Sequence, residues 1–272
     1  PGAPYELKMA CGENPKRVYG RKGVLPSTRM GNMAGYRTAW IGAQEYKRAW
    51  DKYDAEYAEG KNPEAPNRDI KYDTLRGVLE GEVMIHNHCY KAEEMAMMID
   101  LSKEFNYHAG TFHHGIEAYK IADLLADNGS CAALWPDWWG FKMEAYDMVQ
   151  ENVAIVDAVK NSCAVVHSDS DTTIQRLNQE AAKVMYRANE NGFDISEEHA
   201  IKWITTNAAK SLGIDDKTGS LEAGKQGDVV IWNQSPFSVY AKAEQVFVDG
   251  AKVYDRNDST YQATSDFMLG QK

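Results

Sequence analysis

The sequence predicts an α/β fold in which short parallel strands alternate with helices, followed by a small β unit. Between residues 80 and 192, apolar runs are each followed by a segment with apolar residues at helical spacing. This alternation is typical of parallel βαβ units, and wholly apolar strands are expected where helices cover both faces of a sheet. After residue 212 the pattern changes to short strand-like runs with glycine turns and no helices between them.

The predicted elements follow one another in a regular order. Strands are expected in "YELKMACGENP", "GEVMIHNH", "YHAGTFHH", "CAALW" and "CAVVHSD". Helices are expected after the last four of these, in "KAEEMAMMIDLSKEF", "GIEAYKIADLLADNG", "EAYDMVQENVAIVDAVKN" and "TTIQRLNQEAAKVMYRANENG". The highly charged residues 45–72 are predicted to form an exposed helix and loop, an insertion without a site. Near the end, "VDGAKVYD" predicts a tight hairpin that turns at Asp-Gly.

Charge and composition exclude some classes of partner. The formal net charge is -10 and no basic stripe is present, which argues against nucleic acid. No apolar run approaches the ~18 residues that a membrane-spanning helix needs. The four cysteines show no CxxC spacing, so we expect buried thiols rather than disulfides, and the compartment stays open. The opening residues carry no signal-peptide pattern and read as the continuation of a longer chain.

Polar side chains occur at the carboxyl ends of several predicted strands. These residues are His86, His88, His113, His114 and Asp169. In a barrel of parallel strands, that face carries the active site. Imidazole nitrogens and carboxylate oxygens are zinc ligands, and a bound zinc ion makes hydroxide available near neutral pH. A neighbouring carboxylate can move the proton of that water. The pattern therefore predicts a metal site built on His88, His114 and Asp169.

Several of these motifs resemble the amidohydrolase superfamily, and within it the metal-dependent hydrolases related to imidazolonepropionase. "HNHCYKAEEM" resembles the fifth barrel strand of the family, "HHGIEAYKIADLLADNG" the sixth and "HSDSDTTIQRLNQEAAK" the eighth. "ITTNAAKSLGIDDKTGSLEAGKQGDVVIWN" is similar to the stretch where the family's chain leaves the barrel and enters a β-sandwich. The resemblance implies a (β/α)8 barrel of the TIM type, and it covers nearly the whole chain.

The resemblance also implies roles for individual residues. His88, His114 and Asp169 match metal ligands, and Asp169 also matches the catalytic base. On the fourth strand, Lys8 matches a lysine that can be carboxylated to bridge two metals, with Glu13 as the alternative. The cofactor implied is one or two divalent metal ions, with zinc expected.

Three further residues are expected near the substrate. His86 lies one layer deeper on the strand than His88 and is expected to support it or to contact substrate. Trp138 follows the seventh-strand candidate, where aromatic residues either line a pocket or pack beneath a loop. Arg29 lies in a stretch that resembles a loop closing over the site, where it could hold a substrate carboxylate.

One departure from the family is large. Its first metal motif, His-x-His on the first strand, is absent, and the sequence offers about five of the eight βα units. We therefore expect an incomplete barrel over residues 1–212 and sandwich strands with a tail over residues 213–272. An incomplete barrel exposes strand edges. An N-terminal fragment or self-association is expected to complete it.

The function that the resemblance implies is metal-dependent hydrolysis of an amide, a cyclic amide or a peptide-like C–N bond in a small-molecule or peptide-like substrate. One alternative is a ring deaminase of the same superfamily, although a bridging lysine disfavours it. The other is an inactive, truncated fragment that keeps the fold without the metal.

Overall fold

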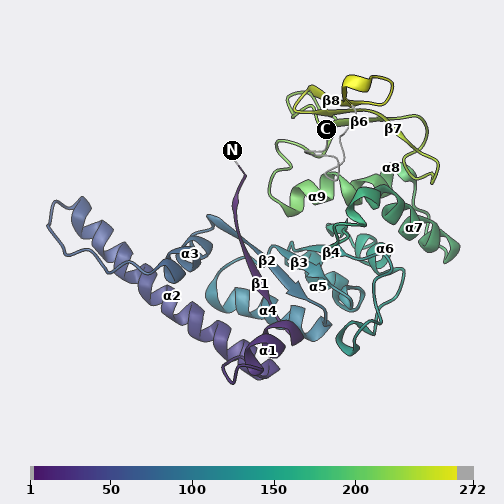
Figure 1. Ribbon diagram of the computed structural model, residues 1–272. Coiled ribbons are helices and arrows are strands. Elements are labelled where there is room, and N and C mark those ends of the chain that lie inside the picture. Colours follow the sequence, from purple (N-terminus) through teal and green to yellow (C-terminus); the bar gives the residue numbers. More distant parts are fainter. Residues whose placement is uncertain (1–2, 262–272) are drawn as a thin grey trace, which may run out of the picture.

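A parallel sheet forms the centre of the molecule. The computed structural model describes residues 3–261. Five strands pair side by side in chain order, and every pairing is parallel (Figure 1). They are β1 (Tyr5–Ala10), β2 (Val83–Cys89), β3 (Thr111–His114), β4 (Cys131–Leu134) and β5 (Ala164–Val166). Each coincides with a stretch that the sequence predicts as a strand, with β2 extending one residue further, so the predicted five strands are confirmed.

Helices fill the connections between the strands. Between β1 and β2 the chain forms α1 (Glu13–Gly20), α2 (Arg29–Ala58) and α3 (Ile70–Leu79). The later connections contain α4 (Ala92–Phe105), η1 (Ala118–Ile121), α5 (Ala122–Asp127), η2 (Met143–Ala145) and α6 (Asn152–Asp157). After β5 come η3 (Ile174–Arg176), α7 (Leu177–Glu190), α8 (Glu197–Ala200), η4 (Ile201–Ile204) and α9 (Thr206–Ser211). The helix expected over 144–161 is thus reduced to a 3₁₀ turn and the short α6.

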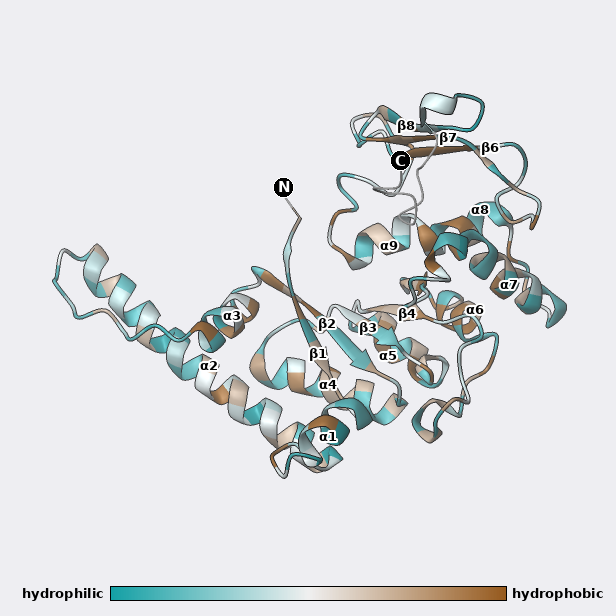
Figure 2. Cartoon of the chain, viewed as in Figure 1, coloured by the Kyte–Doolittle hydropathy of each residue, from teal (hydrophilic) through white to brown (hydrophobic). Residues whose placement is uncertain are grey.

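The largest difference from the sequence-based expectation is α2. This helix starts at Arg29, where a closing loop was expected, and continues through much of the predicted insertion. Thr28 caps it, because its hydroxyl oxygen accepts a hydrogen bond from the amide of Gly31 at 2.9 Å. The outer end of α2 projects away from the sheet, and Figure 2 shows this end and the following loop as mostly hydrophilic or neutral.

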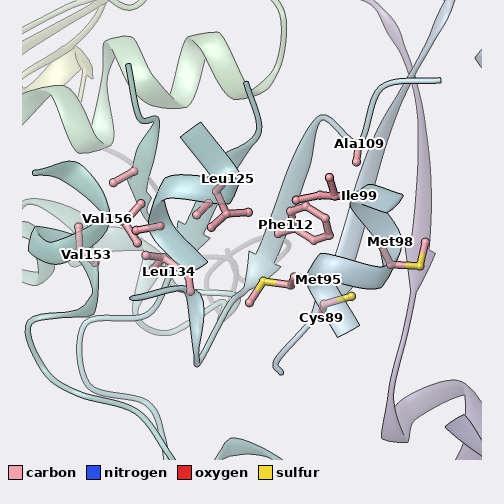
Figure 3. Packing of buried hydrophobic residues seen from close by; sticks show 14 of the residues in the cluster. Cys89, Met95, Met98, Ile99, Ala109, Phe112, Leu125, Leu134, Val153 and Val156 are labelled. Carbon is pink, nitrogen blue, oxygen red and sulfur yellow. The ribbon is translucent and has the colours of Figure 1, made fainter. Parts of the chain in front are cut away.

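The core lies between the sheet and the helices packed on it. Helix α4 turns Met95, Met98 and Ile99 inward, and all three are fully buried. They lie near Phe112 of β3, while Leu134 of β4 continues the same cluster (Figure 3). Strands β4 and β5 contain no polar side chain, and His88, His113 and His114 stand at or next to the carboxyl ends of β2 and β3.

The cysteines correct one prediction. Cys11 is bonded to Cys89 and Cys131 to Cys163, so the expectation of free thiols was wrong for these residues. Sequence spacing cannot show which strands are neighbours. Parallel pairing of β1 with β2, and of β4 with β5, brings the Cα atoms of the two pairs to 5.3 and 4.5 Å.

The residues after α9 form a separate sheet. Strands β6 (Val229–Trp232), β7 (Ala243–Val248) and β8 (Ala251–Asp255) are antiparallel in the order β6-β7-β8, and η5 (Ser259–Tyr261) follows. The predicted hairpin is confirmed. Asp249 and Gly250 both have positive φ, as a tight hairpin turn requires. The end of the expected tail, 262–272, lies outside the described residues.

Strand β1 lies at one edge of the parallel sheet. Within residues 3–261 it pairs only with β2. Lys8, whose place inside an apolar run requires exposure or a partner, is exposed on this strand, and Tyr5 is 79% exposed. In the same part of the chain, no helix has the length and apolarity to cross a membrane.

Candidate active site

Histidines gather at the carboxyl ends of β2, β3 and β5. The parallel register places His88 beside His113, and Cys89 beside His114. His86 Nδ1 lies 2.9 Å from His113 Nε2, so these two rings share one hydrogen bond. His167 follows β5 directly, and its ring centroid lies 5.0 Å from that of His114. Side chains from strands far apart in sequence therefore form one imidazole cluster.

The three expected metal ligands lie together at this cluster. The ring centroids of His88 and His114 are 4.7 Å apart, and His114 Nε2 is 3.7 Å from the Asp169 carboxylate. His114 and Asp169 have φ values of 71° and 50°, in the left-handed region that residues other than glycine rarely adopt. Such strain is concentrated at functional sites, where it directs side chains that a relaxed backbone would turn elsewhere.

Burial keeps these imidazoles neutral. Desolvation is the main cause that lowers the pKa of His88 to about 4 and of His167 to about 3, and nearby cationic groups lower both further. The pKa of His114 is displaced far below its ordinary value for the same reason. Metal ligation requires the unprotonated ring, so the cluster presents ligating imidazoles throughout the neutral pH range.

The donor chemistry of the cluster fits a divalent metal. His114 Nδ1 and His167 Nε2 are buried, and neither has a hydrogen-bond partner in the part of the chain described. A buried polar atom without a partner costs about 1–3 kcal/mol, which a bound ligand or ion would offset. The arrangement of these donor groups around a common point is less complete. No group of three or more His, Cys, Asp or Glu residues between 3 and 261 is arranged to hold an ion. His88 Nε2 instead accepts a hydrogen bond from Asn14 Nδ2 at 3.0 Å.

The two fourth-strand candidates occupy different places. Lys8 is paired in register with His86. Partial burial lowers the pKa of Lys8, and the negative charge of Asp169 raises it by a smaller amount. Glu13 begins α1, and its carboxylate lies 3.9 Å from Lys142 Nζ. Lys8 therefore lies nearer the imidazole cluster, whereas Glu13 interacts with a loop residue.

A cavity of about 530 Å³ adjoins the cluster. Its lining consists of aromatic and acidic residues: Tyr90, Trp135, Asp137, Trp138, Trp139, Phe141 and Asp169. Trp135 connects the cavity to the cluster, because its ring centroid lies 4.5 Å from that of His114. Trp138 is on the wall, where the sequence suggested a pocket residue, and its role in substrate binding stays a prediction. His86 does not line the cavity.

Arg29 lies elsewhere. Its Nη1 atom is 2.5 Å from Glu94, and its Nη2 atom is 3.0 Å from Glu144. Both glutamate side chains are 4% exposed, and burial raises the pKa of each. The structure thus places Arg29 in an ion-pair cluster rather than at the cavity, with both of these nitrogens engaged by glutamates instead of a substrate carboxylate.

Sequence reasoning missed His167 and Asn14. His167 stands two residues before Asp169, so the strand-end position was a usable signal for it. Its ring is nearly parallel to that of Trp135, with centroids 5.8 Å apart. Nothing in the sequence indicates that Asn14 contacts His88. A parallel βα sheet with imidazoles and a carboxylate at its carboxyl edge is the arrangement on which barrel proteins build their active sites, some of them with a bound metal.

Comparisons with known proteins agree with this class. The model of the amidohydrolase family matches residues 143–253. A solved amidohydrolase from Thermotoga maritima is 32% identical with a TM-score of 0.80, over 92% of this chain and 63% of its own. The amidohydrolase tasK of Hapsidospora irregularis is 29% identical over 92% of this chain and 26% of its own length. An imidazolonepropionase of Shewanella oneidensis is 31% identical over 40% of this chain and 25% of its own.

Residues 143–253 thus match the amidohydrolase family, and the similarity to solved and curated amidohydrolases extends over 92% of this chain; members of that superfamily are generally metal-dependent hydrolases and deaminases. A zinc-bound adenosine deaminase from Xanthomonas campestris shares the fold at 17% identity and a TM-score of 0.50. The chain spans about a quarter of the length of the two curated relatives, tasK and the imidazolonepropionase of Shewanella oneidensis.

Proposed function

We propose that the chain supplies most of the active site of a metal-dependent hydrolase that cleaves an amide, a cyclic amide or a peptide-like C–N bond. The observation that supports this most is the placement of His88, His114 and Asp169 at one edge of the sheet. The first two are neutral there, and the carboxylate lies 3.7 Å from His114 Nε2. His88, His114 and Asp169 would hold a divalent ion such as zinc, and Lys8, carboxylated on its amine, would bridge to a second.

Each side chain has a defined task in this proposal. A metal held by these residues would supply activated water and polarise the carbonyl group. Asp169 would take a proton from the attacking water and return it to the departing nitrogen, which is general acid–base catalysis by one carboxylate. In the metal-free chain Asn14 holds the ring of His88 through the hydrogen bond at Nε2, which a metal ligated by His88 would have to displace, and His113 fixes His86 in the layer below.

We also propose that another polypeptide segment completes the site. Strand β1 has an unpaired edge in the described residues, and no three donors there are arranged to hold an ion. A neighbouring strand would satisfy the free backbone groups of β1 and add ligands beside His88. An N-terminal fragment is our first choice and a second copy of the chain our second. In this proposal residues 1–212 form the barrel part and residues 213–272 the sandwich part.

Zinc binding tests the proposal without an assay of activity. We expect isothermal titration of the metal-free protein with zinc to show binding, and zinc to raise the melting temperature as any ligand of the native state does. His88→Ala combined with His114→Ala should abolish both effects. His199→Ala is the matched control, because His199 is a surface residue paired with Asp157. Equal zinc binding by the double variant and the control would show that the ion is held elsewhere.

Activity separates the proposed reaction from the alternative. A panel of amides, cyclic amides, dipeptides and aminated rings would be incubated with the zinc-loaded protein. We expect a new carboxylate from the amide classes, whereas a deaminase would release ammonia from the aminated rings. A panel in which only ammonia appears would replace hydrolysis by deamination as the function.

A further inference from the structure

The cavity beside Asp169 has an unusual lining. Rings of five aromatic residues face it, and its two charged lining residues, Asp137 and Asp169, are both acidic. The lining contains no lysine or arginine. Faces of aromatic rings carry negative potential, and together with carboxylates they attract a cation and disfavour an anion. We propose that this cavity is a cation-binding subsite, and that the substrate carries an alkylammonium group beside the bond that is cleaved.

Ring geometry supports this inference. Trp135, only 4% exposed, forms the inner wall, and the ring centroids of Tyr90, Trp138 and Phe141 lie 5.9, 6.1 and 6.0 Å from its own. Trp138 and Phe141 are tilted by 49° and 64° relative to Trp135, so neither ring is stacked on it. Trp138 is still 41% exposed, which leaves part of its surface open to a ligand.

The protein itself places a cation on these rings. Lys142 Nζ lies 4.4 Å from the ring centroid of Tyr90 and 5.7 Å from that of Phe141. The rim of the cavity thus accommodates an ammonium group at cation–π distance. Lys142 is itself close to Glu13 and Glu144, which engage it at the rim. Trp135, Trp138 and Trp139 of the same lining have no such internal cation in the described residues.

The acidic residues contribute unequally. Asp137 is paired with Lys183 at 2.7 Å, so much of its charge is compensated. Asp169 is 59% exposed and, among the described residues, forms no ion pair with a lysine or an arginine, so its negative charge is less compensated. The cationic group of a ligand would therefore lie between the tryptophans and Asp169. This inference rests on the proposed function for the role of the site, because it places the reacting bond next to Asp169.

Choline and its neutral isostere test the subsite directly. The metal-free chain would be titrated with choline, with 3,3-dimethylbutan-1-ol and with 3,3-dimethylbutanoate, and binding followed by ligand-observed NMR. We expect choline to bind about fivefold or more tightly than the neutral alcohol, and the anion most weakly. Equal affinities for choline and the alcohol, or no binding of choline, would overturn the inference.

Variants locate the binding and separate it from the reaction. Trp138→Ala should remove the preference for choline, Trp138→Phe should retain part of it, and Tyr57→Ala on the distant part of α2 should leave it unchanged. A preference that survives in Trp138→Ala would also overturn the inference. Because no metal is present, a failure of zinc binding or hydrolysis would leave these results untouched, so the two proposals fail independently.

Discussion

Replacing Arg29 by methionine is expected to destabilise the protein by about 3 kcal/mol at pH 7.5. Loss of one partner from a buried ion pair costs about 3–5 kcal/mol, because the other charge stays buried and unpaired. Here the two glutamates are 4% exposed and the arginine side chain 38% exposed, which favours the lower end of that range. Denaturant unfolding of the variant and the wild type measures the difference in the free energy of unfolding.

The effect should depend on pH in a defined direction. Burial already raises the pKa of Glu94 and Glu144 above 4.5, and Arg29 opposes that shift. A carboxyl group with a raised pKa in the folded state stabilises the fold below its unfolded pKa, and this stability is lost as pH rises through the folded value. Without Arg29 both pKa values rise further. The deficit of the variant is therefore smaller at pH 5 than at pH 7.5.

A second arginine of the same helix provides the control. Arg37 is paired with Glu104, and both side chains are more than 40% exposed. Exposed pairs contribute about 0–1 kcal/mol, so Arg37→Met should change the free energy of unfolding little at either pH. If Arg29→Met lowers the free energy of unfolding no more than Arg37→Met does, the ion pairs of Arg29 with Glu94 and Glu144 do not fasten the segment between β1 and β2 to the rest of the fold.

Substituting Asp169 by asparagine is expected to lower the turnover number by about 10²–10⁴-fold, the usual contribution of a general acid–base residue. Asparagine keeps the shape of the side chain and loses its ability to take a proton. Because Asp169 is 59% exposed, the free energy of unfolding should change by less than about 0.5 kcal/mol. Turnover of the best amide substrate of the panel, measured with saturating zinc, gives the result.

Asp171 offers a matched comparison two residues further along the same exposed loop. Asp171→Asn changes the same functional group and should leave turnover within about twofold of the wild type. A similar loss in both variants would indicate a general effect of charge in the loop. A loss below tenfold in Asp169→Asn would assign the proton transfer to another group.

Much of the fold could be predicted because its signals are local. The apolar run of β2, the helical spacing of α7 and the Asp249–Gly250 turn each depend on neighbouring residues only. The strand ends that carry His88, His114 and Asp169 were found for the same reason. The fold then fixed what the sequence left open, namely that these residues approach one another.

The features that escaped prediction depend on pairs distant in sequence. Arg29 and Glu144 are 115 positions apart, and the contact between Asn14 and His88 spans 74. The disulfides depend on which strands are neighbours. Helix α2 escaped because it is long and mostly polar, with few buried residues, so hydrophobic periodicity marks only part of it. His167 was missed although it stands at a strand end, since only one ligand was sought there.

X-ray absorption spectroscopy of the zinc-loaded protein would test the metal site most directly. If His88, His114 and Asp169 hold the ion, the spectrum should show only nitrogen and oxygen neighbours at about 2.0–2.2 Å, with the outer-shell scattering of imidazole rings. That imidazole signal should be absent from the His88→Ala, His114→Ala double variant. Sulfur neighbours at about 2.3 Å, or an imidazole signal that persists in the double variant, would contradict a metal site at the carboxyl ends of β2, β3 and β5.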